Sequence, residues 1–513
     1  MRLVKIGVAS VSVKVGDFAG NTERLRAVIR AARGQRVHLL VTPELAVSGY
    51  SLEDRVFWPD VTRYSWAALA ELADECDGIT AFIGLPVRSG AMIYNAAALV
   101  SDKIIRGLVL KQHLPTYSIF YEGRNWTAWS GGVTEINGVP AGDLVFKLPF
   151  GRVSAEICED LWSASSPAAD RARAGAEIIC NPSASPFTPL KNEDRKRLVL
   201  GAANTLKSVY AYANLVGCDN SRLVFDGGGL IATPEALISE GPLLSRKYWT
   251  LTTGIVDLDN LDRIRAENTT WRKDVSDAVH NGVLTVNCDN VQYRQASVTE
   301  YAEYLPKNFY VREPAKRAEE NGRDPALDEL FDALVLGLRD YFEKVGAFER
   351  FLIALSGGRD SALCLLMAVE AAKSLEEGAK AKDYAKRVST IYLPNRAFSS
   401  AGTLDAAKSL AEELGVPFKV VSIHEETVVA TKKAGEVLGD EDKIAPMAKQ
   451  NLQARVRGAM MLNWGNSANG LLLVTSNLSE AAVGYSTTGG DNQGGYSPIA
   501  NVPKTIVSKL LDY

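Results

Sequence analysis

The segment that decides the fold of the C-terminal half is Ser356-Gly357-Gly358-Arg359-Asp360-Ser361. It follows the apolar run Phe351-Leu352-Ile353-Ala354-Leu355 and precedes a helix-like stretch that begins Ala362-Leu363-Cys364-Leu365-Leu366. A glycine-rich turn between a strand and a helix directs backbone N–H groups and the positive end of the helix dipole at one point, where a phosphate fits. We therefore expect a phosphate site, although an ordinary tight strand-to-helix turn can have the same sequence.

The side chains of this turn add ligands for a nucleotide. Ser356 and Ser361 can donate hydrogen bonds to phosphate, and Asp360 can hold the Mg²⁺ that accompanies a nucleoside triphosphate. The chain has no G-x-x-x-x-G-K-[ST] segment, so the turn is not the common P-loop. It resembles the pyrophosphate loop of the ATP pyrophosphatases, which adenylylate a substrate and release pyrophosphate. The resemblance implies an adenine nucleotide alpha hydrolase-like fold, with ATP bound by Ser356, Gly357, Gly358, Asp360 and Ser361.

The composition predicts a globular protein with more than one domain. A chain of 513 residues is too long for one ordinary core. Its hydrophobic content of 46% and charged content of 23% are typical of globular proteins. The net charge of −4 provides no electrostatic footprint for nucleic acid or a membrane surface, so we expect neither as a partner.

The cysteines and the apolar runs indicate a cytoplasmic protein. The six cysteines include no C-x-x-C pair, so the sequence predicts neither a zinc site nor a disulfide framework. Residues 1–9 are typical of a short buried strand and not of a signal peptide. No apolar run approaches the roughly 20 residues that a membrane span requires.

The first half alternates short β-rich runs with helical stretches. We expect strands at 37–43, 80–84 and 177–181, and a helix at 21–33 with Asn21 or Thr22 as its N-cap. We place a first domain at residues 1–275. Residues 276–325 are polar and irregular, and we interpret them as a linker with a few docked elements.

The second half, residues 326–513, predicts a parallel doubly wound sheet. Its expected strands are 351–355, 388–393, 417–423 and 471–475, and the helix after the second is expected to begin at Thr403 and end at Gly415. Strands separated by single helices form parallel sheets, whose ligands lie beyond the carboxyl ends of the strands. The Ser356–Ser361 turn falls at such an end.

Three reactive side chains in the first half each follow a predicted strand: Glu44, Lys111 and Cys158. Together they have what thiol acyl transfer requires, because a carboxylate can take the thiol proton, a cation can stabilise the thiolate and the oxyanion, and the sulfur can carry the acyl group. We expect a depressed thiol pKa beside Lys111 and a partly desolvated Glu44. Taken singly, these residues are equally typical of a buried apolar cysteine, a turn carboxylate and a strand-end cation.

The order Glu, Lys, Cys and the segments around it resemble the nitrilase, or carbon–nitrogen hydrolase, superfamily. Similar segments are 84–86, 94–97, 120–124, 181–187, 212–217 and 225–228, whereas Gly229 stands where relatives usually have Ser. The resemblance implies an αββα sandwich. It also implies that Glu122 orients Lys111, that Tyr117 and Ser185 contact glutamine, and that Glu159 lies against the amide leaving group.

The second half contains further candidates near its last predicted strand. Glu480 beside Asp360 would give Mg²⁺ two carboxylate ligands, and Lys504 could offset charge on pyrophosphate. Gly489-Gly490 would allow close approach of the backbone to a nucleotide. The plainer interpretations are a mobile loop at 484–495 and an ordinary cation at a helix start for Lys504.

These segments, with 451–457 and 399–403, resemble the NAD synthetase family, and the fused halves resemble its glutamine-dependent members. The resemblance implies that ammonia released from glutamine at Cys158 reaches a second site, where ATP and Mg²⁺ activate the carboxylate of deamido-NAD. Thr475 would lie near the ATP, and Arg455 and Asp491 would contact the dinucleotide. It further implies a symmetric homo-oligomer.

Two alternatives remain at this point: a glutamine-fed ATP pyrophosphatase that amidates another carboxylate, and a catalytically silent scaffold. Family members also continue well beyond the final stretch Val507-Ser508-Lys509-Leu510-Leu511-Asp512-Tyr513. We therefore expect a shortened chain in which the first site is complete and the second is impaired.

Overall fold

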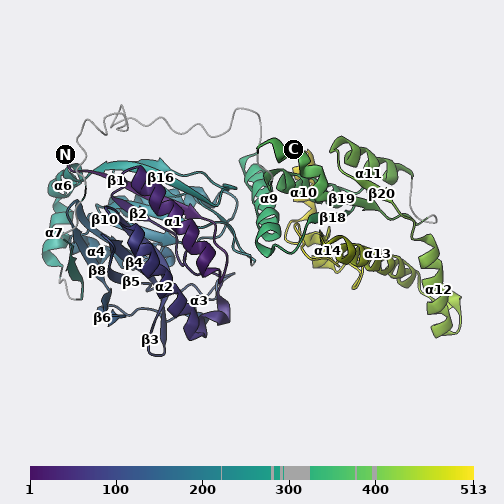
Figure 1. The fold of residues 1–513 in the computed structure, drawn as a ribbon, viewed down its shortest axis with the longest axis horizontal. Coiled ribbons are helices and arrows are strands. Elements are labelled where there is room, and N and C mark those ends of the chain that lie inside the picture. Colours follow the sequence, from purple (N-terminus) through teal and green to yellow (C-terminus); the bar gives the residue numbers. More distant parts are fainter. Residues whose placement is uncertain are drawn as a thin grey trace. The chain divides into compact units, whose positions relative to one another are not determined.

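The structure is a computed structural model, and it describes residues 1–220, 222–278, 282–288, 293, 324–375, 378–395 and 401–512. The chain divides into two compact units, Met1–Arg317 and Ala318–Tyr513. Figure 1 shows the elements of each unit.

Two stacked sheets form the centre of the first unit (Figure 1). Within the described residues, one sheet has the order β16-β1-β2-β3-β4-β5-β7-β6: β1 (Leu3–Val11), β2 (Leu39–Val41), β3 (Thr80–Ser89), β4 (Met92–Ser101), β5 (Ile104–Leu110), β6 (Val133–Ile136), β7 (Val139–Gly142) and β16 (Trp249–Asp257). The other has the order β15-β14-β11-β10-β9-β8-β17: β8 (Leu144–Leu148), β9 (Gly151–Ala155), β10 (Ile178–Ser183), β11 (Val209–Asn214), β14 (Leu230–Ala232), β15 (Leu237–Glu240) and β17 (Leu284–Asn287). A separate hairpin pairs β12 (Val216–Cys218) with β13 (Val224–Asp226).

Helices cover the outer faces of both sheets, which confirms the predicted αββα sandwich. Side chains of α1 (Phe18–Gly34) and α2 (Pro59–Glu75) share a core with the first sheet. Those of α4 (Ala168–Arg173) and α5 (Lys191–Thr205) share one with the second sheet. A third core lies between the sheets, where Phe82 and Phe146 meet edge to face with ring centroids 6.0 Å apart. The remaining helical elements of this unit are η1 (Glu53–Phe57), α3 (Glu122–Asn125), η2 (Cys158–Trp162), α6 (Leu258–Glu267) and α7 (Thr269–Asp277).

Two details of the first unit differ from the prediction. The N-cap of α1 is Asp17, whose carboxylate accepts a hydrogen bond from Gly20 N at 3.0 Å. Asn21 lies inside the helix, and its side-chain amide donates to Lys14 O at 2.8 Å, so this side chain does not cap the helix. In the stretch 276–325, β17 pairs in parallel with β8, so part of the region assigned to a linker extends the second sheet.

The second unit has a parallel sheet with the order β20-β19-β18-β21: β18 (Arg350–Ala354), β19 (Val388–Tyr392), β20 (Phe418–Val420) and β21 (Gly470–Leu472). Its helical elements are α9 (Pro325–Val345), α10 (Arg359–Leu375), η3 (Gly378–Arg387), α11 (Ala401–Glu413), α12 (His424–Leu438), η4 (Glu441–Lys443), α13 (Pro446–Ala468), α14 (Leu478–Val483) and α15 (Lys504–Asp512). Cores on both faces of the sheet confirm the doubly wound prediction, one built with α9, α10, α11 and α15 and the other with α13.

The order of these strands fixes where a ligand can bind. In chain order the sheet reads third, second, first, fourth, so the winding changes direction between β18 and β21. Ligands of doubly wound sheets bind at such a switch point, beyond the carboxyl ends of the strands. The segments 356–361 and 475–480 follow these two strands.

The expected start of one helix in this unit, with Thr403 as its N-cap, is wrong. The helix α11 begins at Ala401, so Thr403 is an internal residue whose hydroxyl lies 2.8 Å from Tyr392 Oη. Its other end agrees with the prediction, because Gly415 adopts the left-handed conformation directly after the helix.

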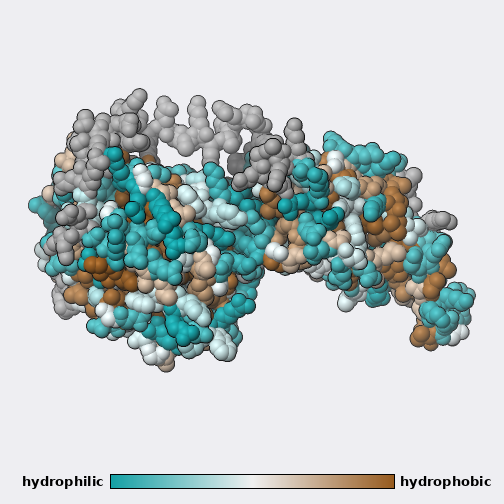
Figure 2. All heavy atoms as spheres, viewed as in Figure 1, coloured by the Kyte–Doolittle hydropathy of each residue, from teal (hydrophilic) through white to brown (hydrophobic). Residues whose placement is uncertain are grey.

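Apolar side chains gather on the visible face of the second unit, over α12 and near α11 and β20 (Figure 2). On α12, Val428, Val429 and Val437 are 54%, 60% and 86% exposed. None of the helices in the described part of the chain combines the length and the apolar character needed to cross a membrane.

The contact between the two sheets can be tested by a double-mutant cycle at Phe82 and Phe146. Each Phe→Ala change should lower the free energy of unfolding of the first unit by about 3–5 kcal/mol, because both side chains are fully buried. The coupling between the two changes should be about 0.5–1.5 kcal/mol. Tryptophan fluorescence during urea denaturation reports mainly on this unit, since Trp464 is the single tryptophan of the second. Additive effects would contradict the contact, and Phe57→Ala at the surface is the control.

Candidate active sites

The first candidate site is built around the ammonium of Lys111, which is completely buried. Lys111 Nζ lies 2.6 Å from Glu44 Oε1 and 2.8 Å from the carboxylate of Glu122. Burial alone would lower the pKa of Lys111, but the two carboxylates outweigh it and raise that pKa well above its ordinary value. Burial also raises the pKa of Glu122, to about 7, although Lys111 opposes this change.

Further hydrogen bonds fix the two carboxylates. Glu44 accepts from Asn95 Nδ2 at 2.7 Å and from Ala184 N at 2.8 Å, and Glu122 accepts from Tyr50 Oη at 2.6 Å. Asn95 and Tyr50 were not assigned roles from the sequence, because nothing local relates them to a carboxylate far along the chain. Glu44 sits in the turn after β2, and β3 can approach this turn only because residue 84 is glycine. A Cβ there would lie 2.4 Å from Pro43 O.

Cys158 stands at the start of η2, directly beyond the end of β9, with a left-handed φ of 49°. The backbone N–H of Ala184, which donates to Glu44, also contacts the sulfur. The expected depressed thiol pKa is wrong. Burial raises the pKa of Cys158 above its ordinary value, and the carboxylates of Glu44 and Glu122 together outweigh the favourable charge of Lys111. The thiol is therefore protonated in the ligand-free protein.

The other predicted residues of this site lie in two places. Tyr117 and Glu159 pair with each other, with Tyr117 Oη donating to Glu159 Oε1 at 2.9 Å, and both line a pocket that also includes His113 and Trp126. Ser185 is buried, and its hydroxyl accepts from Arg195 Nη2 at 3.2 Å.

The sequence analysis missed Lys191, which stands near this site at the start of α5. The pKa of Lys191 is lowered below its ordinary value, because burial and the Arg195 guanidinium outweigh the opposing effects of the nearby Cys158 and Glu159. Its Nζ lies 5.8 Å from the centre of the Trp162 ring. A lysine at a helix start gives no signal in the sequence that separates it from a solvated cation.

The protonated thiol leads to a prediction for its alkylation. The rate constant for the reaction of Cys158 with iodoacetamide should rise about tenfold per pH unit between roughly pH 7 and pH 9, because the thiolate fraction grows with pH below a raised pKa. Mass spectrometry of the modified peptide identifies the site, with Cys158→Ala as the control. A rate constant that levels off below about pH 8 would contradict the raised pKa.

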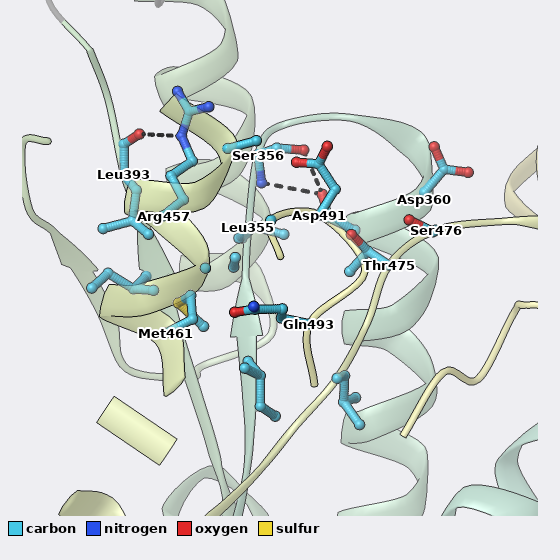
Figure 3. A pocket seen from close by; sticks show the side chains of 18 of the residues that line it. Leu355, Ser356, Asp360, Leu393, Arg457, Met461, Thr475, Ser476, Asp491 and Gln493 are labelled. Atoms are coloured by element: carbon cyan, nitrogen blue, oxygen red, sulfur yellow. Dashed lines mark hydrogen bonds between the residues drawn. The ribbon is translucent and has the colours of Figure 1, made fainter. Parts of the chain in front are cut away.

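The second candidate site is a cavity of about 520 Å³ at the carboxyl ends of β18, β19 and β21. Figure 3 shows Arg457 and Met461 of α13 on one side and Asp360, Thr475 and Ser476 on the other. The predicted residues that line it are Ser356, Asp360, Ser361, Thr475, Glu480 and Asp491.

The glycine-rich turn stands at the start of a long helix and is closed by hydrogen bonds between its own residues. Ser361 Oγ accepts from Ser356 N at 3.2 Å and donates to Gly358 O at 3.0 Å. Gly357 has a φ of 79°, and a Cβ there would lie 2.2 Å from Thr403 O. Only glycine fits this close approach of two backbones.

Asp360 and Glu480 are linked by Asn477. Asn477 Nδ2 donates to Asp360 Oδ1 at 3.1 Å, and Asn477 N lies 3.3 Å from Glu480 Oε2. Lys504 forms an ion pair with the other oxygen of Asp360. Two carboxylates facing one cavity fit Mg²⁺, which typically takes one or two carboxylates and fills its remaining positions with phosphate and water oxygens.

The structure places the two arginines of α13 differently. Arg455 does not line the cavity, and its Nε donates to Thr488 O at 3.1 Å. Arg457 does line it: burial lowers the pKa of Arg457, and the nearby Asp491 carboxylate opposes this change. Arg457 shares one face of α13 with Ala454, Gly458 and Met461, which also line the cavity, so the phase of the helix decides between the two arginines.

Comparison with known proteins identifies the family of each unit. Residues 5–266 match the family model for carbon-nitrogen hydrolases, and residues 330–513 match that for NAD synthase. The chain is 32% identical to a glutamine-dependent NAD(+) synthetase of Aquifex aeolicus over 520 residues, covering 100% of this chain and 81% of the relative. It is 31% identical to that of Thermotoga maritima, covering 99% and 80%.

The fold is similar to two solved structures over almost the whole chain. A glutamine-dependent NAD(+) synthetase from Cytophaga hutchinsonii has a TM-score of 0.80 and 27% identity, covering 99% of this chain and 81% of that one. The enzyme from Acinetobacter baumannii in complex with ADP has a TM-score of 0.77 and 25% identity, covering 100% and 82%. Since the likeness includes both units and continues from one to the other, the chain belongs to the glutamine-dependent NAD(+) synthetase family.

Proposed function

We propose that this chain is a ligase that makes NAD from deamido-NAD, with glutamine as the nitrogen donor and ATP as the activating co-substrate. The products are NAD, AMP, pyrophosphate and glutamate. The observation that carries the proposal is the presence in one chain of a thiol beside the Glu44–Lys111–Glu122 cluster and of a nucleotide-sized cavity at the switch point of a parallel sheet.

In the first site, Cys158 attacks the side-chain amide carbon of glutamine while Glu44 accepts the thiol proton. The oxyanion that forms is stabilised by the ammonium of Lys111, which Glu122 holds in place. The C–N bond then breaks, Glu44 returns the proton to the leaving nitrogen, and ammonia departs. A water molecule attacks the thioester and gives a proton to Glu44, the C–S bond breaks, the proton passes from Glu44 to the sulfur of Cys158, and glutamate is released.

Charged groups near the thiol fit the two ends of an amino acid. A glutamine bound at Cys158 presents an α-ammonium and an α-carboxylate, which need an anion and a cation. We assign the α-ammonium to Glu159, whose carboxylate is oriented by Tyr117, and the α-carboxylate to Lys191. Ser185, held by Arg195, would contact the substrate from the opposite wall.

In the second site, the nicotinate carboxylate of deamido-NAD attacks the α-phosphorus of ATP, and pyrophosphate leaves. Ammonia then displaces AMP from the acyl-adenylate to form the amide. We assign the phosphates to the Ser356–Ser361 turn and Lys504, the nucleotide to Thr475, and the dinucleotide to Asp491 and Arg455. Arg457 joins this set, because it lines the same cavity.

Mg²⁺ would be held by Asp360 and Glu480, and when bound it would offset charge on the phosphates of ATP. Before it binds, Lys504 neutralises Asp360. We therefore expect Lys504 to exchange this carboxylate for the pyrophosphate oxygens when the nucleotide arrives.

The assembly and location belong to the same proposal. Exposed valines on α12 support self-association into a homo-oligomer, because apolar side chains that gather on a surface favour contacts between proteins. Cys76, Cys158, Cys180 and Cys364 are buried thiols, which agrees with a reducing cytoplasm.

The proposal is tested by Cys158→Ala in assays with deamido-NAD and ATP. NAD formation from glutamine should fall by at least about 10³-fold, because the nucleophile is lost, while formation from ammonium chloride stays within about twofold of wild type. Cys76→Ala, at the buried end of α2, is the matched control. Equal loss with both nitrogen sources would contradict separate sites, and no NAD from wild type with either source would refute the function.

The metal role is tested by Asp360→Asn, which keeps the shape of the side chain but removes its charge. NAD formation should fall by about 10²-fold or more with both glutamine and ammonia, since both routes use the same activated carboxylate. Asp383→Asn, on the surface, should leave both activities unchanged. Ammonia-driven synthesis within about threefold of wild type would remove Asp360 from the metal site.

A further inference from the structure

Asp160 connects the two backbone segments that present the catalytic lysine and the catalytic cysteine. Its side chain is completely buried. Oδ1 accepts from Gln112 N at 3.2 Å and His113 N at 2.8 Å, directly after Lys111. Oδ2 accepts from Ile157 N at 2.9 Å, directly before Cys158. One carboxylate therefore binds the neighbours of both catalytic residues.

We propose that Asp160 is a positioning residue that fixes Lys111 and Cys158 relative to each other. This inference rests on the glutaminase function proposed above. Asp160 does not touch the reacting atoms itself. It acts through the backbone of its neighbours, and it serves both sides at once because an ionised carboxylate has two accepting oxygens.

The hydrogen bonds between Asp160 and Ile157 also stabilise the backbone conformation of Cys158. A non-glycine residue with a φ of 49° is in a sparsely populated conformation that persists only where its surroundings enforce it. Asp160 N donates to Ile157 O at 3.1 Å while its side chain accepts from Ile157 N. Asp160 thus bonds both the carbonyl and the N–H group of Ile157, which stabilises the turn that positions the Cys158 sulfur.

His113 couples this carboxylate to the surface of the site. His113 Nδ1 lies 2.9 Å from Asp160 Oδ1, and its Nε2 lies 3.1 Å from Ser163 Oγ. The hydrogen bond to Asp160 raises the pKa of His113 above its ordinary value. The imidazole therefore supports Asp160 from the side that faces the pocket.

A second route joins the same two segments independently. Gln112 Nε2 donates to Asp143 Oδ1 at 2.8 Å, and Arg171 Nη2 donates to the same oxygen at 2.7 Å. Arg171 also binds the carbonyl of Ala155, at the end of the strand before Cys158. Two carboxylates, the partly buried Asp143 and the buried Asp160, thus tie the lysine segment to the cysteine segment, and Asp160 bonds the neighbours of both catalytic residues.

The test compares Asp160→Asn with wild type in glutamine hydrolysis by the full chain. An amide has one accepting oxygen, so it can serve only one of the two segments and places an NH₂ group against the donors of the other. We expect kcat to fall about 10²-fold, since a misplacement of about 1 Å has that effect, while KM for glutamine stays within about threefold. NAD formation from ammonia should stay within about twofold of wild type, because the second site is untouched.

Glu177→Gln is the matched control, because Glu177 is a buried carboxylate at the opposite ends of the same strands. It accepts from Arg152 N at 2.7 Å and pairs with Arg2 at 2.8 Å. This variant should lower the melting temperature and leave kcat unchanged. A kcat of Asp160→Asn within about threefold of wild type, or a loss that appears mainly in KM, would overturn the positioning role.

If Asp160→Asn does not fold, two variants at His113 test the same positioning role. Asn at position 113 can still donate to Asp160, whereas Ala cannot, so His113→Ala should lower kcat about fivefold and His113→Asn should keep it within about twofold. Equal values for the two would overturn the inference. A wild-type chain without glutamine hydrolysis would instead refute the glutaminase function itself, so the two failures are distinguishable.

Discussion

The buried ammonium of Lys111 is the constraint on which the first unit depends. Removing either carboxylate from such a cluster costs about 3–5 kcal/mol, because it leaves a charge without compensation in a medium that solvates it poorly. The cluster is therefore stable only as a set. Glu44, Lys111 and Glu122 follow different strands or lie in a short helix, and each is held by groups from yet other segments, such as Tyr50 and Asn95. We therefore expect the sandwich to fold and the site to assemble in the same transition.

The second unit reaches its site by a different principle. Its cavity follows from the strand order, which separates the segments after β18 and β21 and leaves space between them. Backbone geometry shapes the turn proposed to bind phosphate, through the left-handed Gly357 and the start of α10. Side chains add charge at the rim, and the ion pair between Lys504 and Asp360 keeps that charge balanced before a nucleotide binds.

The sequence predicted those parts of both sites that depend on residue type at a strand end. Glu44, Lys111 and Cys158 could be identified because few combinations of residue types support thiol acyl transfer. The Ser356–Ser361 turn could be identified because it places glycines and serine hydroxyls together between a strand and a helix. Asp160 and Asn95 could not be identified, since their partners are backbone groups or residues far along the chain. The choice between Arg455 and Arg457 needed the phase of α13 relative to the cavity, and β17 needed its distant partner β8.

The prediction of the thiol pKa failed for an instructive reason. It considered the single cation beside Cys158, whereas the structure places two carboxylates and one ammonium there, in a buried site. A thiol that stays protonated is protected from oxidation and from adventitious electrophiles. In the proposed mechanism the thiol becomes a nucleophile when a substrate carbonyl is close enough for attack and proton transfer to Glu44 to occur together. In that mechanism ammonia forms only after Cys158 has attacked a bound glutamine.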